Sequence, residues 1–175
     1  RIAADEIVKI NINPSKENNM ESVEKSIEVE APIKEVYNQW TEFERFPEFM
    51  EGVEEVRQLD DGRLHWVAEI GGKKKEWDAE IYEQIPDHRI AWRSTSGTRN
   101  GGAVDLLPKD AGRTRVTLKM DYEPEGVFEH LGDALDMVTE RVEGDLERFK
   151  EFIQARGTET GSGLGGINEE KSRTA

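Results

Sequence analysis

Residues 76–94 read EWDAEIYEQIPDHRIAWRS and decide the fold. Trp77 and Ile81 lie on a two-residue alternation of apolar and charged side chains, which is typical of a strand with one buried face. The sequence Pro-Asp-His at 86–88 predicts a turn, and Trp92 lies in the strand expected after it. The stretch therefore predicts an antiparallel hairpin with two tryptophans on one apolar face.

The same kind of pattern extends on both sides of this hairpin. Before it, Pro32 is expected to open a helix that ends near Trp40, and Pro47 a single short turn. Alternating apolar residues predict seven strands in all, at 22–30, 53–59, 63–70, 76–85, 89–94, 101–108 and 114–122.

The last expected element is one amphipathic helix over residues 127–155, where apolar residues recur at a mean spacing close to 3.6. This order of elements indicates an α+β fold with a seven-stranded antiparallel sheet. One helix covers so wide a sheet only if the sheet curves around it, and a curved sheet encloses a volume. Gly132 and Gly144 lie within the helix, which predicts close packing against the sheet or a bend near a ligand.

Three tryptophans decide whether the enclosed volume is filled. Trp66, Trp77 and Trp92 come from consecutive strands and can all face inward, each burying about 150–250 Å². Each buried indole N–H then needs a hydrogen-bond partner or a water molecule. The pattern alone leaves two alternatives open, a solid core or a cavity with tryptophan walls.

Composition excludes several classes of function. The 175-residue chain carries 38 acidic and 24 basic residues, and its net charge of −14 repels nucleic acids and anionic lipid head groups. No apolar run reaches the roughly 18 residues of a membrane span, and no stretch has a signal-peptide pattern, so we expect a cytoplasmic protein. We expect one domain at 20–156, a polar N-terminal extension at 1–19 and a glycine-rich disordered tail at 157–175.

Few residues offer catalytic or metal-binding chemistry. The chain has no cysteine, which excludes disulfides and a thiol nucleophile. His65, His88 and His130 lie far apart without metal-ligand spacing, so neither a metal nor another cofactor is expected. Glu83 is the one acidic residue in phase with Trp77, and we expect it to be solvated. A general acid or base positioned in a cavity is therefore not predicted.

Six segments, in their order along the chain, resemble a known family. They are EAPIKEVYNQWTEFERFPEFMEGVEEV (30–56), HWVAEI (65–70), EWDAEIYEQIPDHRIAWRS (76–94), GGAVDLLP (101–108), TRVTLKMDYEP (114–124) and DLERFKEFI (145–153). The chain resembles the START-like (SRPBCC) superfamily, whose helix-grip fold is also that of the birch-pollen allergen. The most similar branch is that of polyketide cyclase/dehydrase-like proteins related to coenzyme-Q-binding proteins, and the match covers about 23–155.

This resemblance implies a deep apolar cavity between the sheet and the long helix. It implies cavity walls made by strand residues Trp66, Trp77, Ile81, Trp92, Val104, Leu118 and Met120, and by helix residues Phe128, Leu131, Leu135 and Val138. It also implies a mouth near the FPEFM turn, where Phe46, Phe49 and Met50 are candidate gate residues.

The leading hypothesis is a binding or carrier module for a small hydrophobic molecule, namely a lipid, an isoprenoid quinone or a polyketide-like compound. One alternative is a polyketide aromatase/cyclase that shapes a reactive chain and shields it from water. Another is a protein-interaction module whose cavity is filled. Exposed strand edges leave homodimer formation open.

Overall fold

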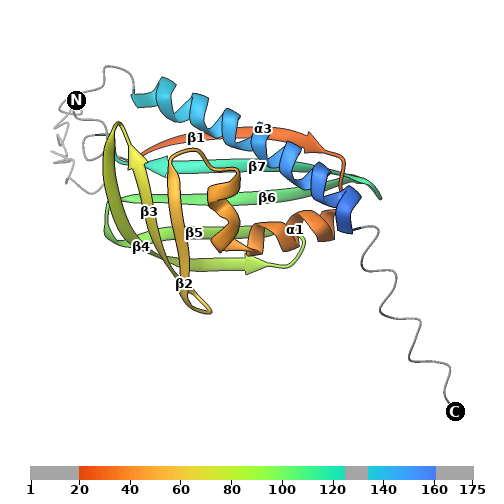
Figure 1. The fold of residues 1–175 in the computed structure, drawn as a ribbon, viewed down its shortest axis with the longest axis horizontal. Coiled ribbons are helices and arrows are strands. Elements are labelled where there is room, and N and C mark those ends of the chain that lie inside the picture. The colour runs from red at the N-terminus through yellow and green to blue at the C-terminus, as the bar shows by residue number, and fades with distance from the viewer. Residues whose placement is uncertain (1–19, 125–133, 161–175) are drawn as a thin grey trace, which may run out of the picture.

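The computed structural model describes residues 20–124 and 134–160, apart from the side chains of 157–160. The strands are β1 (Glu21–Val29), β2 (Val53–Asp60), β3 (Arg63–Ile70), β4 (Lys73–Ile85), β5 (Arg89–Gly97), β6 (Asn100–Asp110) and β7 (Arg113–Tyr122). The helices are α1 (Ile33–Thr41), the 3-10 helix η2 (Phe43–Glu48) and α3 (Ala134–Thr160). Figure 1 shows their arrangement.

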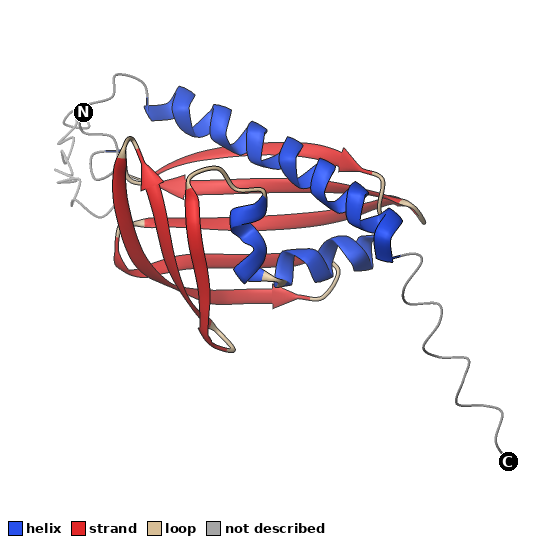
Figure 2. Ribbon diagram, viewed as in Figure 1, coloured by secondary structure: helices blue, strands red, loops and turns tan. Residues whose placement is uncertain are grey.

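The strands form one antiparallel sheet in the order β1-β7-β6-β5-β4-β3-β2. Five pairs of neighbouring strands are consecutive in the chain, from β2-β3 to β6-β7, and β1 pairs with β7 at the other edge of the sheet. The sheet curves, and α1, η2 and α3 all lie on its concave side (Figure 2). The predicted α+β helix-grip architecture, with seven antiparallel strands around a long C-terminal helix, is confirmed.

Two details differ from the sequence-based expectations. Helix α3 ends at Thr160, so it continues past the expected end at Ala155 and into the first residues of the predicted tail. Each added helical residue gains a backbone hydrogen bond, so a polar segment can extend a helix without burying an apolar face. Residues 1–19, 127–133 and 161–175 of the predicted extension, helix and tail lie outside the described residues.

The second difference concerns Glu83, which the simple alternation places on the face of Trp77. The pairing of β4 with β5 shifts register between Ile81 and Glu83, as a β-bulge does. Glu83 therefore lies opposite Ala91 in the strand pairing. Its carboxylate forms an ion pair with Arg89, whose Nε lies 3.1 Å away, and Arg89 also donates to Asp105. These residues form an ion-pair cluster with partly exposed side chains, and Glu83 belongs to this cluster instead of the concave face.

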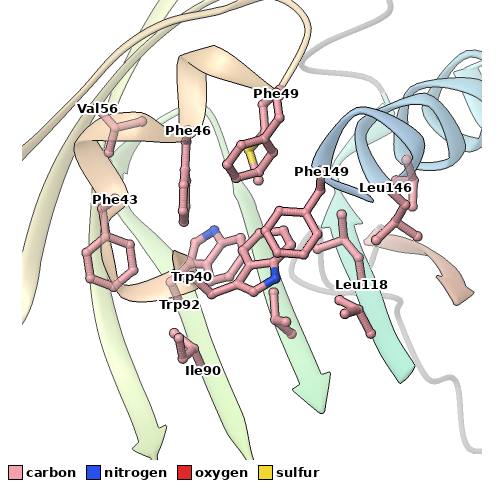
Figure 3. Packing of buried hydrophobic residues seen from close by; sticks show 14 of the residues in the cluster. Trp40, Phe43, Phe46, Phe49, Val56, Ile90, Trp92, Leu118, Leu146 and Phe149 are labelled. Carbon is pink, nitrogen blue, oxygen red and sulfur yellow. The ribbon is translucent and has the colours of Figure 1, made fainter. Parts of the chain in front are cut away.

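Aromatic side chains fill the space beneath α1 and η2 (Figure 3). Trp40 contacts Phe46, Phe49 and Phe149 with ring centroids 5.6, 5.3 and 4.7 Å apart. Phe46 reaches the sheet, where its ring lies 6.5 Å from that of Trp92. All five side chains are buried, so this part of the concave face is a solid core.

Trp92 fits into this core because a glycine faces it across the sheet. Gly102 pairs with Trp92 between β5 and β6. A Cβ atom on Gly102 would lie 2.4 Å from Cζ2 of Trp92, a distance that real carbon atoms do not tolerate. The absent side chain thus provides the space in which the indole lies.

We expect Gly102→Ala to lower the free energy of unfolding by about 1–3 kcal/mol, because the new methyl group overpacks the core against Trp92. Urea denaturation followed by circular dichroism measures the change. Gly62→Ala is the matched control, since a Cβ at Gly62 has no neighbour within 4 Å. Equal stability of the two variants would contradict the packing argument.

Candidate ligand-binding cavity

A cavity of about 130 Å³ remains at the other end of the concave face, between the sheet and α3. Its apolar lining comes from Met50, Val53, Trp66, Ala68, Ile70, Trp77, Met120, Met137, Val138 and Val142. Its polar lining comes from Glu51, Thr98, Asn100, Asp121, Tyr122, Arg141 and Asp145. For comparison, an apolar cavity of about 150 Å³ holds benzene.

Three indoles connect the cavity to the solid core. Trp66 and Trp77 pair directly across β3 and β4, and their rings stack with centroids 5.7 Å apart and an angle of 12° between the planes. Trp66 also stacks on Trp92, at 6.1 Å and 20°. Trp92 belongs to the core and Trp77 lines the cavity, so both alternatives for the tryptophans hold, each for a different part of the enclosed volume.

The indole N–H groups of Trp66 and Trp77 have no hydrogen-bond partner among the described residues, and both Nε1 atoms are buried. The two side chains are only 4% and 7% exposed. An indole N–H is a donor and cannot act as an acceptor. Two of the lining side chains thus carry buried donors without a partner, although their Nε1 atoms have no surface exposed to the cavity.

Polar residues of α3 hold the turn that forms one side of the cavity. The Asp145 carboxylate accepts a hydrogen bond of 3.0 Å from the Glu51 backbone N–H and another from the Arg148 guanidinium. Arg148 Nε donates to the Phe49 carbonyl at 2.9 Å, and Arg141 donates to the Glu51 carbonyl at 3.0 Å. These bonds connect the end of η2 to helix α3 across the concave face.

Two glycines make these contacts sterically feasible. Gly52 adopts a positive φ of 79°, and a Cβ there would lie 2.5 Å from the Arg141 guanidinium and 2.7 Å from the Glu69 carbonyl. At Gly144 a Cβ would meet the Arg148 guanidinium at 3.0 Å. Gly144 thus gives room for an arginine that folds back along α3, while Gly132 lies outside the described residues.

Asp145 is 7% exposed and its charge is not freely hydrated. Burial raises the pKa of its carboxyl above the ordinary value, and the bonds from Glu51 and Arg148 offset this effect only in part. The proton is therefore held more tightly on Asp145 in the folded protein than in the unfolded chain.

The other ionisable groups of the lining have partners in the protein. Burial and a 2.8 Å hydrogen bond to Glu21 raise the pKa of the Tyr122 hydroxyl to about 12, so the phenol stays protonated near neutral pH. Asp121 accepts a hydrogen bond from the Ser22 hydroxyl and forms an ion pair with Lys119 at 3.4 Å.

Five of the fourteen predicted site residues line this cavity: Met50, Trp66, Trp77, Met120 and Val138. Six others, Phe46, Phe49, Ile81, Trp92, Val104 and Leu118, pack in or against the core cluster and are not among the lining residues. Leu135 is 49% exposed at the start of the described part of α3. Phe128 and Leu131 lie outside the described residues.

The packing explains why the expected gate residues Phe46 and Phe49 do not border the cavity. Both rings are fully enclosed by other aromatic side chains, with Phe46 5.6 Å and Phe49 5.3 Å from Trp40. Of the three candidates only Met50, which follows η2, reaches the cavity.

The polar lining, above all Asp145 and Arg141, was not predicted from the sequence. A signal was present, because Asp145 follows Val138 by seven residues and hence lies on the same face of the helix. An acidic residue on an apolar stripe is the kind of departure that marks a site.

A model of the family "Polyketide cyclase / dehydrase and lipid transport" matches residues 29–151. The chain belongs to this family. This bears out the resemblance to the START-like superfamily and its polyketide cyclase/dehydrase branch. Membership by itself allows both transport and catalysis, since the family name includes the two.

The chain is similar to a 17.2 kDa uncharacterized protein from the melC2-rnhH intergenic region of Streptomyces lincolnensis. The two are 49% identical over 149 residues, which cover 85% of this chain and 99% of the relative.

Solved structures of similar fold include a Thermus thermophilus protein with 26% identity and a TM-score of 0.65, covering 78% of this chain and 99% of the other. The Zhui aromatase/cyclase of a Streptomyces species has 19% identity and a TM-score of 0.64, covering 85% and 99%. A START superfamily protein of Mycobacterium smegmatis has 19% identity and a TM-score of 0.61, covering 77% and 95%. At 19% identity the likeness shows a shared fold.

Within residues 20–124 and 134–160, no helix has the length and apolar character needed to cross a membrane. The same residues contain no group of three or more His, Cys, Asp or Glu side chains that could hold a metal ion.

Asp145 predicts a specific dependence of stability on pH. Its folded pKa is raised, so the wild-type protein should lose stability relative to Asp145→Asn as pH rises from about 3.9, the usual value of an aspartate, through the raised folded value. Asparagine retains an oxygen acceptor for the Glu51 N–H and does not titrate. Urea unfolding of both proteins from about pH 4 to about pH 7 tests this window.

Glu147→Gln is the control, because it removes an exposed carboxylate from the same helix. It reports the effect of net charge alone. A stability difference between wild type and Asp145→Asn that does not vary with pH, or that varies in the opposite direction, would argue against the burial of a titrating carboxyl.

Proposed function

We propose that this protein binds a small hydrophobic molecule in the cavity between the sheet and α3 and carries it without chemical change. The observation that supports this proposal is the cavity itself, whose walls combine apolar side chains with the two buried indoles of Trp66 and Trp77. Such a site binds through apolar area removed from water, at about 25 cal/mol per Å² before entropy costs. Lipids, isoprenoid quinones and polyketide-like molecules fit this chemistry.

The partners of the ionisable lining residues support binding over catalysis. Tyr122 donates to Glu21, Asp121 accepts from Ser22, and Arg141 donates to the Glu51 carbonyl. A general acid or base must be within hydrogen-bond reach of the substrate and able to exchange a proton with it. Groups already bonded within the protein are poorly placed for that role.

A second function, catalysis of the polyketide aromatase/cyclase type, is favoured by Asp145. This carboxyl lines the cavity, is buried and has a raised pKa, which are properties of general acids in active sites. The Zhui aromatase/cyclase has the same fold. Under this hypothesis the cavity would hold a reactive chain and Asp145 would supply or accept a proton.

The third hypothesis, an interaction module with a filled cavity, has less support. It needs a solid interior, whereas the described residues leave about 130 Å³ unfilled beside Trp66 and Trp77.

We expect Ala68→Leu to reduce the amount of bound ligand, because Ala68 lines the cavity and the larger side chain occupies part of it. Native mass spectrometry of protein purified from its own organism, compared with the denatured mass, measures the retained compound. Leu135→Ala is the matched control, since Leu135 is exposed and not among the lining residues. A wild-type protein without extra mass under these conditions would contradict the carrier proposal.

The same measurement separates a carrier from an enzyme. Organic extraction identifies the compound retained by wild type and by Asp145→Asn. A carrier should retain the same compound in both proteins. An enzyme that uses Asp145 should retain product in the wild type and unreacted substrate in the variant.

A further inference from the structure

Strand β1 forms one edge of the sheet. It lies at the end of the strand order, and within the part of the chain that the structure describes it pairs with β7 alone. In an antiparallel sheet, every second residue of an edge strand directs its N–H and C=O groups away from its neighbour. These groups can bind a further strand, so the edge of β1 is a possible docking surface.

A groove of about 470 Å³ lies between this edge and helix α3, which passes beside β1 (Figure 1). Lys25, Ser26 and Ile27 line the groove from β1, and Gly144 and Leu146 are among the residues that line it from α3. Successive residues of a strand point to opposite faces, so a lining of three consecutive residues extends to the strand edge itself. The groove thus leaves room beside the middle of β1 for another extended segment.

The sequence before β1 has the pattern of a strand that would fit this groove. Residues 7–12 read IVKINI, in which the apolar residues Val8, Ile10 and Ile12 alternate with the polar residues Lys9 and Asn11. This alternation predicts a strand with one apolar face. The next three residues are Asn-Pro-Ser, which favour a turn, and they precede the start of β1 at Glu21.

A reversal of the chain over residues 13–20 would place residues 7–12 antiparallel to β1, with Lys9 opposite Glu24. Val23 and Val29 of β1 are buried on the side of α3, so Glu24 lies on the other face of the sheet. Glu24 is exposed, and among the described residues the ion pairs of β1 involve Lys25 and Glu28 instead. In this register the apolar face of the segment would pack toward α3, and Lys9 would supply a cation for Glu24.

We propose that residues 7–12 dock on the edge of β1, in the groove beside α3, as an eighth strand of the sheet in the same molecule. A short connection to β1 gives this segment a high effective concentration at the edge, which a separate partner lacks. The added strand would pair the edge and prevent association with a second copy through β1. This surface lies outside the ligand-binding cavity, and the inference does not depend on the proposed function.

Cross-linking tests this contact directly, because the chain contains no cysteine that could compete with an engineered pair. We expect Lys9→Cys/Glu24→Cys to form an intramolecular disulfide, since opposite residues of paired strands have Cα atoms about 4.5–5.5 Å apart. Lys9→Cys/Arg57→Cys is the matched control, because Arg57 is exposed on β2 at the opposite edge of the sheet. In glutathione buffers at low protein concentration, the first disulfide should persist at an about tenfold more reducing ratio than the control.

Hydrogen exchange tests the same contact without cysteines. Nuclear magnetic resonance of the full chain measures exchange of the β1 amides that point away from β7. These amides should exchange about tenfold faster in Ile10→Pro than in the wild type, because proline removes a backbone donor and disrupts the docked strand. Ala3→Pro is the matched control, since it places a proline in the same extension but outside residues 7–12.

Three results would overturn the inference. An intermolecular disulfide in Lys9→Cys/Glu24→Cys at low protein concentration would assign the groove to the segment of a second copy. Equal resistance of the two engineered disulfides to glutathione would show that the segment has no preference for β1. Exchange rates of the β1 amides that Ile10→Pro leaves unchanged would show that the edge is not paired by this segment. These measurements involve no ligand, so each of these results leaves the carrier proposal standing.

Discussion

A curved seven-stranded sheet closed by one helix encloses more volume than the side chains of that helix can fill, and the structure depends on how this volume is divided. At one end α1 and η2 insert Trp40, Phe46 and Phe49, which pack edge-to-face in a solid core. At the other end the lining includes the small Ala68 and the flexible Met137, and a cavity remains. Trp66 lies at the boundary, because it stacks both on Trp92 of the core and on Trp77 of the cavity wall.

The stack of indoles has a consequence for polarity. A buried ring that stacks on two others has little freedom to turn its N–H toward a distant acceptor, so the donor of Trp66 stays where the packing puts it. An unpaired buried donor costs about 1–3 kcal/mol of stability. Trp66 and Trp77, which border the cavity, carry such a cost, and so does Trp40 in the core.

Local periodicity explains what the sequence could predict. The alternation around Trp77 and Trp92 determines which face each side chain occupies, and the order of turns determines which strands pair, so the sheet and the inward tryptophans followed from the sequence. Glu83 departed from this rule because a bulge, which the alternation does not reveal, shifts the register of β4.

Long-range packing explains what the sequence could not predict. Phe46 was expected at a cavity mouth and lies in the core, because its environment depends on Trp40 and Trp92, which reach it from α1 and from β5. Asp145 is the clearest case. Its carboxylate accepts a hydrogen bond from a backbone N–H that lies 94 residues earlier in the chain, and no local pattern contains that partner.

The contacts of Asp145 also bear on whether the cavity binds or reacts. Its Oδ1 atom accepts hydrogen bonds from both the Glu51 N–H and Arg148, and Arg148 in turn holds the Phe49 carbonyl. The carboxyl therefore helps to shape the wall next to which it lies. Each change in its protonation would alter the contact with Arg148 and hence the wall, so use of this group as an acid would disturb the binding site during each turnover. A carrier has no such conflict, because its wall stays the same while the ligand enters and leaves. The raised pKa of a buried carboxyl is thus explained by the architecture of the cavity, and catalysis is not needed to account for it.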